Sequence, residues 1–149
     1  MSNPQFSGPA VRFIQRLLGR FGVRIARVSA PVDPVAPFDV LEAVLQAHGP
    51  GNYCEHGGGS LLSRRVSVEE LGWTRTADAA ADLVLVDEGA ATAERIDDMF
   101  DAHIRPPIIH YEWSELSVER RCAVKQRLLD EGYRFLDVGG DTIALRSDT

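Results

Sequence analysis

The sequence has few cysteines and no long apolar run. Its two cysteines, Cys54 and Cys122, are too few for a disulfide framework and have no C-x-x-C spacing. No run approaches the roughly 18–20 apolar residues that a membrane-spanning helix needs. The N-terminus lacks the apolar stretch and small-residue cleavage site of a signal peptide. These absences exclude a disulfide-stapled miniprotein and a transmembrane protein, and we expect a cytoplasmic protein.

Positive charge is scarce outside the N-terminus. The first 30 residues carry five arginines and no acid, whereas the rest of the 149-residue chain carries 11 basic and 22 acidic residues. Phosphate binding needs a positive surface, so the acidic body argues against nucleic acid as a partner. We therefore divide the chain into a basic helical arm, residues 1–30, and a folded domain, residues 38–149.

Within the arm, the spacing of apolar residues predicts an amphipathic helix over residues 9–21, with Arg12, Arg16 and Arg20 on a neighbouring face. Such a helix can pack on the domain with its arginine edge in solvent. It can also contact an anionic membrane surface or dock on a partner. The first alternative is favoured, and peripheral membrane contact is not.

The domain alternates helices with apolar strands. The apolar pattern predicts helices at residues 38–48, 92–103 and 117–131, and strands at residues 66–68, 83–86, 107–111, 133–138 and 142–145, with a short segment at 52–55 before a glycine run. In the last helix, Val118, Cys122, Leu128 and Leu129 are expected to face inward. The order predicts an α/β fold whose sheet is mostly parallel, with an antiparallel C-terminal hairpin and the N-terminal helices packed on it.

Ligands of open α/β sheets bind beyond the carboxyl ends of the strands. The groups expected there are the stretch from Glu55 through Gly57 to Gly59, the adjacent acids Asp87 and Glu88, and Glu112. The glycines permit close approach of a ligand, and the acids can accept hydrogen bonds from hydroxyl or ammonium groups. Alternatively, the glycines form a surface turn and the acids face water. Being adjacent, Asp87 and Glu88 are expected to diverge.

Two histidine-containing patterns invite a metal interpretation. His110 and Glu112 lie two apart on a strand, hence on one face, but the P-C-x-x-C that completes a deaminase zinc site is absent. Cys54-x-His56 has no second pair to complete a tetrahedral site. No structural zinc is therefore predicted, and His110 is expected to be a hydrogen-bonded residue of the core or of a cleft wall.

The order of these segments resembles the FkbM family of S-adenosylmethionine-dependent methyltransferases. The resemblance covers mainly residues 66–145 and rests on four segments of this sequence: VSVEEL (66–71), DLVLVDEGA (82–90), RPPIIHYEWSELS (105–117) and LLDEGYRFLDVGGDTIAL (128–145). Upstream, RLLGRFGVRI and PFDVLEAVLQ are similar to the lead-in helices of some members.

The resemblance implies a Rossmann-type methyltransferase sheet and S-adenosylmethionine as cofactor. It implies O-methyl transfer to a hydroxyl of a small molecule or glycan. Carried over by position, Glu55, Gly57, Gly59 and Asp87 would bind the cofactor, and Asp87, Glu88 and Glu112 would be the catalytic acids.

The resemblance also implies the strand order 3-2-1-4-5-7-6, but only six residues separate Gly59 from Val66. The second and third strands of the family have no room there, and no ribose-binding acid is assigned. We therefore expect a shortened sheet whose first strand is an exposed edge. The arginine helix can cover such an edge, or the edge can pair with a second copy in a homo-oligomer. An alternative function follows: a non-catalytic remnant that acts as a protein-interaction or assembly module.

Overall fold

Three α-helices and a six-stranded sheet make up the part of the chain that the computed structural model describes, residues 37–57 and 68–147. The predicted arm (1–30), its helix (9–21) and Gly59 lie outside these residues. No helix in the described ranges is long and apolar enough to span a membrane.

The sheet has the strand order β2-β1-β3-β4-β6-β5. Its strands are β1 (Asn52–Gly57), β2 (Thr74–Arg75), β3 (Leu83–Asp87), β4 (Ile108–Glu112), β5 (Tyr133–Val138) and β6 (Asp141–Arg146). The first four pair parallel with one another, whereas β6 pairs antiparallel with both β4 and β5. The predicted α/β fold with a parallel sheet and an antiparallel C-terminal hairpin is confirmed.

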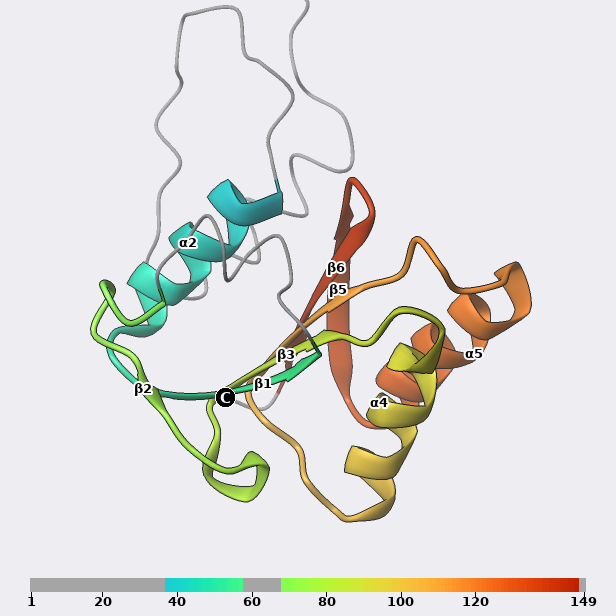
Figure 1. Cartoon of the computed structure of the whole chain (residues 1–149), viewed down its shortest axis with the longest axis horizontal. Helices are drawn as coiled ribbons and strands as arrows, with labels where there is room; N and C mark the ends of the chain where they lie inside the picture. Colours follow the sequence, from blue (N-terminus) through green and yellow to red (C-terminus); the bar gives the residue numbers. More distant parts are fainter. Residues whose placement is uncertain (1–36, 58–67, 148–149) are drawn as a thin grey trace, which may run out of the picture.

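Helix α2 (Pro37–His48) covers one face of the sheet (Figure 1). Its apolar residues recur at helical spacing and are buried: Val40, Leu41, Val44 and Leu45. They belong to one hydrophobic cluster with Leu83 and Leu85 of β3 and with Trp73. Since side chains alternate along a strand, the odd-numbered residues of β3 face α2.

Helices α4 (Thr92–Asp101) and α5 (Val118–Asp130) cover the opposite face (Figure 1). Ile96 and Phe100 of α4 pack there with Val84 and Val86, the even-numbered residues of β3. Trp113, which follows β4, packs partly buried against this second cluster. Two separate apolar cores therefore lie on the two faces of one sheet.

The buried face of α5 differs from the prediction. Val124 and Leu128 are buried, whereas Val118 is 68% exposed, Leu129 is 52% exposed and Cys122 is exposed. At about 100° per residue, positions 124 and 128 lie together on one side of a helix, and 118, 122 and 129 lie on another. The residues predicted to face inward combined Leu128, on the first side, with Val118, Cys122 and Leu129, on the second. Only the first side of the helix packs against the sheet. Ser117 caps the start of α5, because its hydroxyl accepts a hydrogen bond from the Arg120 N–H at 3.3 Å.

The expected edge strand is not at the edge. The two-residue strand β2 pairs with Asn52 and Tyr53 of β1, and its backbone contact continues as the Thr76 N–H donates to the Tyr53 carbonyl at 2.8 Å. The predicted strand at residues 66–68 is wrong at Val68, which lies buried in a turn; residues 66 and 67 lie outside the described ranges. A short outer strand thus lies beside β1, where the sequence predicted an exposed edge.

Candidate functional site

The order in which strands are added to the sheet reverses between β1 and β3. From β1 the chain continues to β2 on one side, whereas β3 lies on the other side of β1 and the chain then proceeds outward to β4. Parallel sheets bind ligands beyond the carboxyl ends of the strands that flank such a reversal. Glu55 and Gly57 lie at that end of β1, and Asp87 and Glu88 lie at that end of β3. Four of the predicted site residues therefore lie at the reversal point.

Gly57 allows the carboxyl ends of β1 and β3 to lie in direct contact. It is paired with Asp87 and has φ +104°, a conformation that other residues rarely adopt. A Cβ atom at this position would lie 1.8 Å from the Asp87 carbonyl oxygen. The predicted need for glycine is explained here by contact between the two strands.

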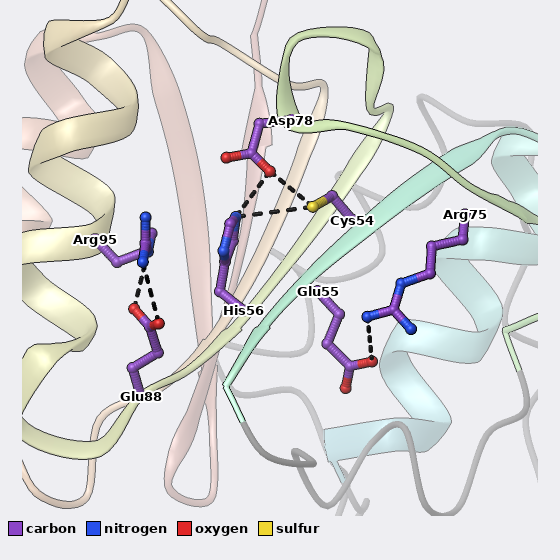
Figure 2. Close-up of polar contacts among 7 residues, drawn as sticks. All are labelled: Cys54, Glu55, His56, Arg75, Asp78, Glu88 and Arg95. Carbon is purple, nitrogen blue, oxygen red and sulfur yellow. Dashed lines mark hydrogen bonds and ion pairs between the residues drawn. The ribbon is translucent and has the colours of Figure 1, made fainter.

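Glu55 brings an unpaired carboxylate oxygen to this end of the sheet. Its side chain is 15% exposed, and Oε2 lies 3.9 Å from Nη2 of Arg75. Oε1 is buried and has no hydrogen-bond partner among the described residues. In Figure 2, Glu55 and Arg75 lie to one side of β1, apart from Cys54 and His56. Among the described residues, Oε1 is therefore a buried acceptor whose hydrogen-bonding capacity is unused.

Asp87 lies among other acids at the carboxyl ends of β3 and β4. Partial burial and the negative charges of Glu112, Asp141 and Glu115 raise the pKa of Asp87 above its usual value. Glu112 accepts a hydrogen bond from the Ser114 N–H at 2.8 Å, which fixes the carboxylate at the end of β4. The structure thus brings two of the predicted catalytic acids, Asp87 and Glu112, into one electrostatic group.

Glu88 does not join this group. Its carboxylate accepts hydrogen bonds from Arg95 of α4 at 2.9 and 3.2 Å (Figure 2). This pairing with Arg95 lowers the pKa of Glu88 below its usual value. The predicted divergence of Asp87 and Glu88 is therefore observed, and Glu88 is engaged in an ion pair.

His110 lies below the acids on β4 and is 1% exposed. Its Nε2 lies 3.6 Å from Oδ2 of Asp141, and neither ring nitrogen has a hydrogen-bond partner among the described residues. It shares the face of β4 that carries Glu112, because the two residues are two apart. The predicted position in the core is confirmed, whereas the predicted hydrogen bonding of the ring is not found among the described residues.

A second polar group, absent from the predicted site, lies on the other face of β1. Asp78 follows β2 in the short 3-10 turn Asp78–Ala80, and its Oδ1 lies 2.7 Å from Sγ of Cys54 and 2.8 Å from Nε2 of His56. The Cys54 sulfur lies 3.8 Å from the same Nε2 (Figure 2). The C-x-H spacing was the only sequence signal for this group, since nothing in the sequence links Asp78 to it.

This group is not arranged as a nucleophilic triad. A relay through histidine needs the cysteine on one ring nitrogen and the acid on the other, but here Cys54 and Asp78 both approach Nε2. Burial and the neighbouring Asp78 raise the pKa of the Cys54 thiol to about 11, so the thiolate is disfavoured. The three side chains instead form a hydrogen-bonded cluster whose possible ligand atoms all lie within 4.8 Å of one another.

Comparisons of this chain with protein-family models, with curated proteins and with solved structures give no match.

Proposed function

We propose that the chain is a homologue of the FkbM-type methyltransferases that binds S-adenosylmethionine at the carboxyl ends of β1 and β3. The observation that carries the proposal is that the order of strand addition reverses between these two parallel strands, with Glu55, Gly57 and Asp87 beside that point. The strand order supports it as well. Removing the outermost strand, 3, from the order 3-2-1-4-5-7-6 leaves 2-1-4-5-7-6. This order corresponds strand by strand to β2-β1-β3-β4-β6-β5, and both end in an antiparallel hairpin.

The residues at this end of the sheet fit a ligand that carries hydroxyl and cationic groups. The unpaired Glu55 Oε1 can accept a hydrogen bond, and the acids around Asp87 create a negative potential that favours a sulfonium or ammonium group. The first acid after β2, Asp78, is directed toward Cys54 and His56, so it is not available to a ribose at this site. One missing charge-assisted hydrogen bond weakens binding by about 1.5–3 kcal/mol.

When bound, the cofactor supplies an activated methyl group. Asp87 is suited to accept the proton of the hydroxyl that receives it, because its raised pKa makes it a stronger base than an ordinary carboxylate. Glu112, held by the Ser114 N–H, is placed to orient that hydroxyl. Glu88, engaged with Arg95, takes a positioning role at the start of α4.

A second candidate function is an interaction or assembly module, and the shortness of β2 favours it. β2 pairs only with Asn52 and Tyr53, so no described strand pairs with the rest of β1 on that side. A strand edge of this kind can accept a strand from another chain. This candidate predicts self-association or partner binding without any affinity for the cofactor.

Isothermal titration of the purified chain with S-adenosylmethionine and S-adenosylhomocysteine separates the two candidates. We expect micromolar binding that Glu55→Gln and Asp87→Asn each weaken about tenfold or more. Glu119→Gln, a charge-matched change at an exposed residue of α5, leaves binding unchanged. Absence of binding up to millimolar ligand, on a chain shown to be folded, refutes the methyltransferase proposal. Sedimentation of the same sample then tests for self-association.

A further inference from the structure

We infer that Cys54, His56 and Asp78 form a binding site for a zinc ion. Within the described ranges they are the one group of three histidine, cysteine or acidic residues whose ligand atoms all lie within 4.8 Å of one another. The site is distinct from the proposed cofactor site, because these side chains lie on the α4 face of β1 and Glu55 lies on the α2 face (Figure 2).

The backbone explains why the three donors converge. Cys54 and His56 are two apart on β1, so their side chains leave the same face of the strand. Asp78 reaches them from the turn that follows β2, the strand next to β1. All three side chains are therefore anchored to adjacent parts of one sheet edge.

The distances suit a tetrahedral ion. Zinc with Zn–S of about 2.3 Å and Zn–N of about 2.1 Å sets its sulfur and nitrogen ligands roughly 3.6 Å apart. Sγ of Cys54 and Nε2 of His56 are 3.8 Å apart. The Asp78 oxygen is closer to both, at 2.7 and 2.8 Å, so the carboxylate must withdraw by less than about 1 Å to reach the same spacing. A partly exposed side chain on a short turn can do this by rotation.

The donor types favour zinc over the hard cations. Thiolate and imidazole are ligands of zinc and related transition metals, whereas magnesium and calcium take oxygen ligands. Three protein ligands leave a fourth position, and the side chains of His56 and Asp78 are 17% and 28% exposed, so water can reach it. An open fourth position is typical of zinc sites that bind or activate a small molecule.

The surrounding charges are compatible with a dication. Glu88 and Arg95 approach from the α4 side as a mutual ion pair, and Arg75 approaches from β2 facing Glu55. Each arginine thus has an acidic partner, and the thiolate and the Asp78 carboxylate supply two negative charges for the ion. The thiol proton is released to solvent when the metal binds.

Cobalt substitution tests the site in the full-length chain. The chain has only two cysteines, so a thiolate-to-cobalt charge-transfer band in the near ultraviolet must come from Cys54 or Cys122. We expect one equivalent of Co²⁺ to produce this band and Zn²⁺ to displace it, with a zinc dissociation constant of about 1 μM or below. Cys54→Ser abolishes the band, and Cys122→Ser, at an exposed residue of α5, retains it. His56→Gln and Asp78→Asn each weaken zinc binding at least about tenfold, and His103→Gln, at an exposed histidine, does not.

A second measurement does not depend on changing a ligand. In the Cys122→Ser protein, Cys54 is the sole thiol, and saturating Zn²⁺ should slow its alkylation at least about tenfold. A folded wild-type chain that gives no cobalt band overturns the inference. So does a band that survives Cys54→Ser, a zinc affinity unchanged by both His56→Gln and Asp78→Asn, or alkylation that zinc does not slow. Binding of S-adenosylmethionine is not measured in these experiments, so their failure leaves the proposed function to its own test.

Discussion

Replacing Gly57 by alanine should destabilise the domain by much more than the same change at Gly132. Both glycines have positive φ, +104° and +85°, so both substitutions place an L residue in a conformation that costs about 1–2 kcal/mol. Reduced entropy of the unfolded chain offsets about 0.4–1 kcal/mol of that cost. At Gly132 nothing lies within 4 Å of the added Cβ, so we expect a net loss of about 0.5–1 kcal/mol.

At Gly57 the new methyl group also meets the backbone of β3. Its carbon would lie 1.8 Å from the Asp87 carbonyl oxygen, where ordinary contact begins at 3.4 Å, so the two strand ends must separate. Forcing extra volume into a packed site costs about 1–3 kcal/mol, which brings the expected total for Gly57→Ala to about 2–4 kcal/mol. The contact is backbone to backbone, so no side-chain rotation can relieve it.

Urea unfolding followed by circular dichroism measures both free energies of unfolding on the same scale. Gly49→Ala is a further control, because Gly49 has φ +83° and open space around the added carbon. Equal losses for Gly57→Ala and Gly132→Ala would refute the argument that β1 and β3 are held in contact at Gly57. The comparison also affects how ligand binding by a Gly57 variant is interpreted. A variant that fails to bind a cofactor has also lost the contact between β1 and β3, so its failure does not show that Gly57 touches the cofactor.

Three further predictions concern neighbouring residues whose environments differ. Leu128→Ala should cost about 2–5 kcal/mol, because Leu128 is fully buried, whereas Leu129→Ala should change stability by less than about 0.5 kcal/mol; similar losses from the two would contradict the assigned face of α5. Asp87→Asn should stabilise the domain at pH 7, because the raised pKa of Asp87 means that folding opposes its ionisation. This gain should shrink as the pH falls through the raised pKa and disappear below pH 3.8, where Asp87 is protonated in both states; a gain independent of pH in urea titrations would contradict it. Glu88→Gln should lower the free energy of unfolding by about 0–1 kcal/mol above pH 4.5, since Glu88 pairs with the 38% exposed Arg95. This loss should vanish as the pH falls through the lowered pKa of Glu88. A larger loss of stability at neutral pH would show that more than a surface ion pair is broken.

Most helices and strands could be predicted because their patterns are local. The run Leu83 to Val86 is apolar on both faces, as a central parallel strand requires, and it forms the middle of the sheet. The helix at residues 92–103 differs from α4 by two residues at its end, where His103 adopts φ +60° and closes the helix. In these segments, burial follows directly from spacing.

The parts that the sequence did not predict depend on contacts between distant segments. β2 consists of two exposed polar residues, Thr74 and Arg75, and it is a strand only because β1 lies beside it. Asp78 reaches Cys54 across 24 positions of sequence as a result of that same pairing. The positions of Asp87 and Glu112 could be predicted because each ends a strand. The position of the third donor, Asp78, could not.

The two cores give the molecule an internal pair of fluorescent probes. Trp73, 3% exposed, lies in the core under α2, and Trp113 packs against the core under α4 and α5 with the Arg121 guanidinium 4.3 Å from its ring. The chain has no other tryptophan, so replacing either one by phenylalanine leaves an emission that reports on a single face of the sheet. Coincident unfolding midpoints for the two proteins would mean that both layers melt as one cooperative unit, and separated midpoints would identify the face that opens first.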